Sequence, residues 1–94
     1  MNEISIYQLL KLNNPKIIDI RDKYSYTIGN LKNSINIPVE NISSIEYPVD
    51  SVIIVYCASG MRSANVAETL VDLGYTDVYN LDGGLINWGF DLVK

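Results

Sequence analysis

The sequence contains no histidine and a single cysteine, Cys57, among its 94 residues. Without histidine, the chain has no imidazole to act as a general base beside a serine or cysteine nucleophile, and it can form no His-ligated metal site. A single cysteine also excludes an intramolecular disulfide and a CxxC redox pair. Any chemistry at Cys57 must therefore proceed without an imidazole base.

The chain is also short of positive charge and of long apolar runs. Seven lysines and arginines stand against eleven acidic residues, which gives a formal net charge of −4 and a sequence pI near 4.5. Affinity for phosphate backbones depends on clustered lysine and arginine, so we expect no nucleic-acid partner. No apolar stretch approaches the roughly 18 residues that a membrane span needs, so we expect no membrane association.

The length and composition fit one compact domain. A chain of 94 residues that is 48% hydrophobic leaves room for one core, so we expect a single domain over residues 1–94 with one functional site. The first residues, Met1 to Ile4, lack the basic start and apolar core of a secretory signal. This start predicts a cytoplasmic protein.

Hydrophobic periodicity and turn residues predict strands that alternate with helices. Strands are expected at residues 17–20, 34–38, 52–56 and 77–81. Helical segments are expected at residues 5–12, 22–29, 39–45, 62–73 and 82–88. The run at 52–56 is the most apolar and is β-branched, which makes it the candidate for the central strand. The alternation predicts an α/β sandwich around a mainly parallel sheet.

Cys57 stands immediately after the expected central strand, where ligands bind in sheets of this class. The next helix begins near Arg62, and the first backbone N–H groups of a helix have no partners within it, so they form a cradle for an anion. The field of these groups and the Arg62 cation favour a thiolate, so we expect the Cys57 pKa to lie below about 8.5. The small residues Ala58, Ser59 and Gly60 leave the N–H groups unblocked.

Three segments, which together extend over nearly the whole chain, carry recognisable motifs. The first, at residues 18–21 (IDIR) and 29–38 (GNLKNSINIP), is similar to I-D-V-R … G-H-I-x-G-A-x-N-I-P. The second, at residues 56–63 (YCASGMRS), resembles the active-site loop Y-C-x-x-G-x-R-S. The third, at residues 74–88 (GYTDVYNLDGGLINW), resembles G-[YF]-x-x-V-x-x-L-x-G-G-x-x-x-W. The three motifs, in this order, resemble those of single-domain rhodaneses, and the resemblance implies a rhodanese-like three-layer sandwich.

The resemblance also implies sulfurtransferase chemistry. Cys57 would take the outer sulfur of a donor such as thiosulfate, become a persulfide, and pass the sulfur to cyanide or a thiol. The implied substrate-binding residues are Ala58, Ser59, Gly60, Met61 and Arg62, and supporting roles fall to Asp19, Arg21 and Ser63. No metal or organic cofactor is implied, and the partners are a small-molecule donor and acceptor or a protein persulfide donor or acceptor.

Two positions depart from the family pattern. Asn30 stands where the family usually has His, and Ser25 or Tyr26 occupies the place of a usual Glu-Phe pair. Both changes bear on whether Arg21 retains the carboxylate with which it would normally pair. For Asp19, which lies in an apolar strand, we favour bracing of a neighbouring loop over direct catalysis, because a buried carboxylate must be hydrogen-bonded.

Two other functions use the same residues. A cysteine phosphatase would also place a thiolate at a helix N-terminus, but phosphatase loops resemble C-x₅-R, whereas four residues separate Cys57 from Arg62 here. A partner-binding domain, or a persulfide carrier loaded by a dedicated protein donor, is the second alternative. Retention of both Cys57 and Arg62 argues against an inactive scaffold but is compatible with a protein donor.

Overall fold

The computed structural model describes residues 2–88 and residue 92. Within them, the strands form one sheet in the order β1-β5-β4-β2-β3, and all neighbouring strands run parallel. The strands are β1 (Asn2–Ile4), β2 (Lys16–Asp19), β3 (Ser34–Asn36), β4 (Val52–Tyr56) and β5 (Asp77–Leu81). The parallel sheet and the central place of β4 confirm the prediction. Strand β1 was not predicted.

The helices follow the expected segments, with small differences at their ends. They are α1 (Ile6–Leu10), α2 (Lys23–Ile28) and α3 (Met61–Asp72), and two 3₁₀ helices, η1 (Val39–Ser44) and η2 (Gly84–Asn87). The capping box at Ser5 and the cap at Asp22 are both formed. Helix α1 ends two residues before the predicted end at Leu12. Across the described ranges, no helix is both long enough and apolar enough to cross a membrane.

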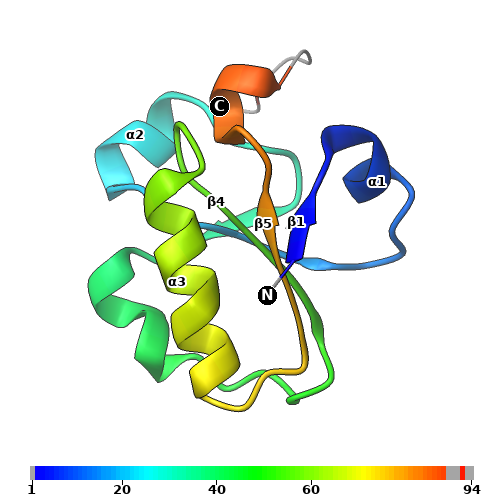
Figure 1. Cartoon of the computed structure of the whole chain (residues 1–94). Helices are drawn as coiled ribbons and strands as arrows, with labels where there is room; N and C mark the ends of the chain where they lie inside the picture. Colours follow the sequence, from blue (N-terminus) through cyan, green and yellow to red (C-terminus); the bar gives the residue numbers. More distant parts are fainter. Residues whose placement is uncertain (1, 89–91, 93–94) are drawn as a thin grey trace.

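Helices cover both faces of the sheet and create two hydrophobic cores. Successive side chains of a strand point to opposite faces, so Ile53 and Val55 of β4 pack towards α3 and η1, while Ile54 and Tyr56 pack towards α1. All four side chains are fully buried. Figure 1 shows α3 and η1 on one side of the sheet and α1 on the other. This arrangement is the expected three-layer sandwich.

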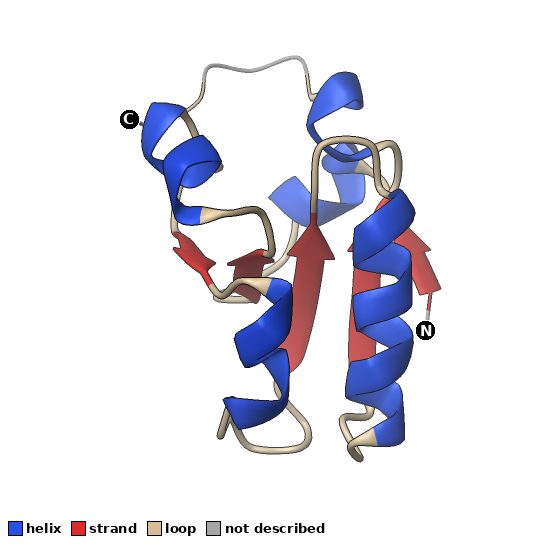
Figure 2. Ribbon diagram, turned by 90° about the vertical axis from the view of Figure 1, so that its left-hand side faces the viewer, coloured by secondary structure: helices blue, strands red, loops and turns tan. Residues whose placement is uncertain are grey.

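The carboxyl ends of β2, β4 and β5 lie along the same edge of the parallel sheet. Figure 2 shows the arrow of β4 leading into the loop that connects it to the long helix α3. Cys57 is the first residue after β4, and Gly60 is the residue before α3 begins. The fold therefore places the cysteine where a buried strand turns into a helix N-terminus, as the sequence predicted.

Candidate active site

The sulfur of Cys57 lies inside the loop that joins β4 to α3. The backbone N–H of Gly60 donates to Sγ over 3.1 Å, and the hydroxyl oxygen of Ser63 lies 3.4 Å from Sγ. Cys57 is only 1% exposed, so the loop covers the thiol. The backbone of this loop therefore curls around the sulfur atom, as the small residues allow.

Glycines on two segments make this closure possible. Gly60 has a φ of 89°, a left-handed conformation that a side chain would strain. Gly84 packs directly against the loop, and a Cβ added there would lie 2.8 Å from the Gly60 nitrogen and 2.8 Å from the Ala58 carbonyl oxygen. The same carbonyl accepts a hydrogen bond from the N–H of Ile86 over 3.1 Å. Gly84 therefore lies in a turn that packs closely against the loop around Cys57.

The pKa of the Cys57 thiol is lowered from its ordinary value. Burial is the largest single influence and raises the pKa, but hydrogen bonds from the Ser63 hydroxyl and from the N–H groups of Ser63, Gly60 and Ser59 together outweigh it. These donors stabilise the anionic thiolate more than the neutral thiol. The loop can thus activate the cysteine without an imidazole base.

The other predicted loop residues surround the covered thiol at the surface. Ala58, Ser59 and Arg62 are exposed, and Met61 is 76% exposed. Arg62 lies on the first turn of α3 and lines a shallow pocket of about 220 Å³ between α3 and η1. The structure therefore brings the predicted substrate-binding residues together around Cys57, with Gly60 beneath them and buried.

One further residue, which is linked to the sulfur through Ser63, was not identified from the sequence. Asn80 on β5 is 2% exposed, and its Oδ1 accepts a short hydrogen bond from the hydroxyl of Ser63. Its Nδ2 donates to the Gly60 carbonyl over 3.0 Å and to the Glu3 carboxylate over 3.0 Å. An amide within a buried strand must be hydrogen-bonded, and this rule could have drawn attention to Asn80 as it did to Asp19.

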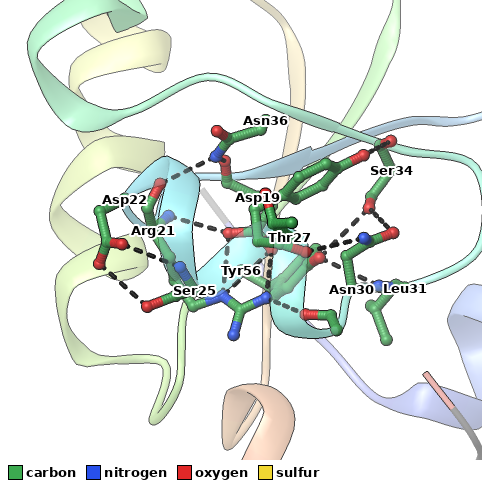
Figure 3. Close-up of polar contacts among 12 residues, drawn as sticks. Asp19, Arg21, Asp22, Ser25, Thr27, Asn30, Leu31, Ser34, Asn36 and Tyr56 are labelled. Carbon is green, nitrogen blue, oxygen red and sulfur yellow. Dashed lines mark hydrogen bonds and ion pairs between the residues drawn. The ribbon is translucent and has the colours of Figure 1, made fainter. Parts of the chain in front are cut away.

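Asp19 and Arg21 form an ion pair at the end of β2 (Figure 3). The fully buried Asp19 carboxylate accepts from the backbone N–H of Arg21 over 2.9 Å and from its Nη2 over 2.7 Å. Nη2 also donates to the carbonyl of Gly29, and the hydrogen bond with Asp19 raises the Arg21 pKa. Arg21 therefore has a carboxylate partner despite the changed residues at positions 25 and 26.

Asn30, which replaces the usual family His, is buried in an adjoining network (Figure 3). Its Nδ2 donates to the Tyr26 carbonyl over 2.9 Å, and its Oδ1 accepts from the Ser34 hydroxyl over 3.4 Å. Tyr56 donates to the same Ser34 oxygen over 3.2 Å and accepts from the Leu31 N–H over 3.1 Å. Burial is the main cause that raises the pKa of the Tyr56 phenol. The asparagine thus joins a hydrogen-bonded network with Ser34 and Tyr56.

Comparison with known proteins identifies the family. The family model for the Rhodanese-like domain matches residues 5–90. The chain belongs to the rhodanese-like family. A thiosulfate sulfurtransferase GlpE from Pseudoalteromonas translucida is 40% identical to this chain over 90 residues, which cover 90% of this chain and 86% of the relative.

Two further matches extend the comparison. The adenylyltransferase and sulfurtransferase uba4 from Ogataea parapolymorpha is 33% identical over 88 residues, covering 90% of this chain but 23% of that protein. The solved structure of a rhodanese-like domain protein from Staphylococcus aureus superposes with a TM-score of 0.87 at 29% identity, and the match covers 99% of this chain and 97% of that one. The rhodanese fold and the sulfurtransferase family are thereby confirmed.

Proposed function

We propose that this rhodanese is a sulfurtransferase in which Cys57 carries the transferred sulfur as a persulfide. The Cys57 thiolate attacks the outer sulfur of a donor such as thiosulfate and forms a new S–S bond. The S–S bond within the donor breaks at the same time, and sulfite leaves with its electron pair. A thiol or cyanide then attacks the outer sulfur, takes it away, and restores the Cys57 thiolate.

The observation that carries this proposal is the set of hydrogen-bond donors directed at Sγ, among them the N–H of Gly60 at 3.1 Å. A persulfide places its outer, anionic sulfur about 2 Å beyond Sγ. Fixed N–H dipoles of the loop stabilise negative charge there as an oxyanion hole does. Arg62, exposed on the adjoining helical turn, attracts anionic donors into the loop.

The same geometry disfavours phosphatase chemistry. The four residues between Cys57 and Arg62 close tightly over a sulfur atom that is already 1% exposed. A tetrahedral phosphate needs the wider ring of a C-x₅-R loop. We therefore expect no turnover of p-nitrophenyl phosphate under conditions that load Cys57 with sulfur.

A protein persulfide donor is the second candidate, and the surface beside the loop favours it. The exposed Met61, with 76% of its surface free beside the loop, gives such a donor an apolar contact next to Cys57. In this case thiosulfate loads the cysteine slowly, whereas a persulfidated protein donor loads it readily.

The test is intact-protein mass spectrometry after incubation with thiosulfate, followed by peptide mapping. We expect Cys57 to gain one sulfur atom that cyanide removes, and the Cys57→Ser variant to gain none. A desulfurase persulfide is the parallel donor, and preferential loading by it supports the second candidate. A folded protein with a free thiol that gains sulfur from neither donor would show that the proposal is wrong.

A further inference from the structure

Ser63 has one hydroxyl hydrogen and two neighbours that can accept it. Sγ of Cys57 lies 3.4 Å from the hydroxyl oxygen on one side, and Oδ1 of Asn80 lies within hydrogen-bond distance on the other. Ser63 is fully buried, and Cys57 and Asn80 are 1% and 2% exposed. A hydroxyl donates one hydrogen bond, so the sulfur and the amide oxygen compete for the same hydrogen.

The amide of Asn80 is held with its oxygen towards Ser63. Its Nδ2 donates to the Gly60 carbonyl and to the Glu3 carboxylate, each over 3.0 Å. A carbonyl and an ionised carboxylate can accept hydrogen bonds but cannot donate them. A flipped amide would set its oxygen against both acceptors. The competition for the Ser63 hydrogen is therefore built into the orientation of Asn80.

The charge of Sγ determines whether the Ser63 hydrogen goes to Sγ or to Oδ1 of Asn80. In the thiol state, the S–H of Cys57 can donate to the Ser63 oxygen while the Ser63 hydrogen goes to Asn80, so every group has a partner. In the thiolate state, a charged acceptor attracts the Ser63 hydrogen, and the buried Asn80 oxygen then loses its donor, which is unfavourable. In the persulfide, the negative charge moves to the outer sulfur, and the hydrogen can return to Asn80.

We propose that Asn80 is a positioning residue that competes with Cys57 for the Ser63 hydrogen, and so makes the free thiolate more reactive and favours its loading with sulfur. The inference deepens the proposed function and rests on it for the loading step. The ionisation step needs no sulfur donor and can be measured by itself. Ser63 and Asn80 then act on the same sulfur in opposite directions.

Other ionisable groups surround the cysteine and define the controls. On the elements packed around Cys57 they are Glu3 on β1, Asp19 and Arg21 at the end of β2, Tyr56 on β4, Arg62 on α3, Tyr75 after α3 and Asp82 after β5. Of these, Glu3 reaches the sulfur through Asn80 and Ser63. The double-mutant cycle below subtracts the influence of these groups, including the loss of the Asn80–Glu3 hydrogen bond, because that loss is common to both Ser63 backgrounds.

The experiment measures the Cys57 pKa from the pH dependence of alkylation by iodoacetamide in a double-mutant cycle. Ser63→Ala removes a donor to the thiolate and raises the pKa. In the Ser63→Ala background, the change in the Cys57 pKa on Asn80→Leu measures what Asn80 does through the Gly60 loop alone. In the wild-type background, the same substitution also ends the competition for the Ser63 hydrogen. We expect the difference between the two changes, which measures the competition, to be a lowering of the pKa by roughly 0.5 to 1. An additional effect of zero or of opposite sign would overturn the inference.

Two further variants keep the result interpretable. Asn36→Leu removes another bracing asparagine, whose Nδ2 donates to the carbonyls of Asp19 and Arg21 over 3.0 and 2.8 Å, and it should leave the Cys57 pKa unchanged. Asn80→Ala removes the same acceptor with a smaller side chain, and the coupling it gives should have the same sign as that of Asn80→Leu. Far-UV circular dichroism establishes that each variant is folded.

Loading is measured separately, as the persulfide fraction in fixed mixtures of thiosulfate and sulfite. Asn80→Leu should lower this fraction, by up to about tenfold in the equilibrium constant if the pKa falls by about 1. The double-mutant cycle can give the expected difference in pKa while the wild-type protein forms no persulfide. That result would refute the proposed function and leave the ionisation result intact. A normal persulfide fraction in Asn80→Leu would refute the loading part of the inference.

Discussion

Replacement of Gly84 by alanine should displace the loop around Cys57. A Cβ at this position would lie 2.8 Å from the Gly60 nitrogen and from the Ala58 carbonyl oxygen, and still closer to the Cys57 carbonyl oxygen. All three contacts are with backbone atoms, which cannot turn aside as a flexible side chain does. The loop or the η2 turn must therefore move, and the Gly60 N–H that donates to Sγ is among the groups affected.

The magnitude has two parts. Gly84 has a φ of 57°, and a left-handed conformation costs a non-glycine residue about 1–2 kcal/mol. Overpacking against fixed neighbours adds about 1–3 kcal/mol. Gly84→Ala should therefore lower the free energy of unfolding by about 2–5 kcal/mol, a large share of the roughly 5–15 kcal/mol that stabilises a domain.

Gly74→Ala is the matched control. Gly74 also has a positive φ, of 106°, but a Cβ added there meets nothing within 4 Å. The Gly74→Ala variant should lose only the contribution of backbone conformation to the free energy of unfolding, about 1–2 kcal/mol. Its Cys57 pKa should equal that of the wild type. Urea unfolding and iodoacetamide alkylation across pH measure the two quantities. Equal losses of stability for both variants, with an unchanged Cys57 pKa in Gly84→Ala, would refute the role assigned to the contact.

Three other perturbations test separate parts of the site. The loading rate should rise with pH as one ionisation whose midpoint lies below the pKa of an ordinary thiol, since the Cys57 pKa is lowered and the chain has no histidine; two ionisations in the rate profile between pH 5 and 8 would contradict this. The lowered pKa also adds stability that is fully present above the unfolded-state pKa of the thiol and is lost as the pH falls through the folded-state pKa, which urea unfolding across pH can follow. Arg62→Ala should slow loading by anionic thiosulfate more than by a neutral organic persulfide, and equal slowing in kinetic assays would remove the charge-attraction role. Asp19→Ala should cost about 3 kcal/mol in urea unfolding, because it leaves the mostly buried Arg21 guanidinium without its carboxylate; a loss below about 1 kcal/mol would show that the ion pair is dispensable.

The strands and the long helix were predictable because their signals are local. The apolar run of β4 and the helical spacing in α3 each extend over enough residues to define a period. Strand β1 has three residues, of which only Ile4 is buried, so no alternation could be recognised. Its pairing with β5 joins residues at opposite ends of the chain, and no local pattern predicts such a pairing.

The same distinction separates the parts of the site. The position of Cys57 and the left-handed turn at Gly60 follow from a short stretch of sequence between a strand and a helix. The contact of Asn80 with Glu3 depends on the register of β1 against β5, in which these two residues are direct partners. Since register is set by the assembled sheet, the sequence could indicate that Asn80 needs partners but could not identify them.

The structure also separates two effects that the sequence had combined. The sequence attributed thiolate stabilisation to the helix N-terminus and to Arg62 together. In the structure, hydrogen bonds from Ser63 and from N–H groups of the loop lower the Cys57 pKa, while the Arg62 side chain is exposed. Hydrogen bonds to a buried sulfur are little affected by salt, whereas the field of an exposed arginine is screened over about 10 Å at 0.1 M salt. Ionisation of the nucleophile and attraction of the donor can therefore change independently in this loop.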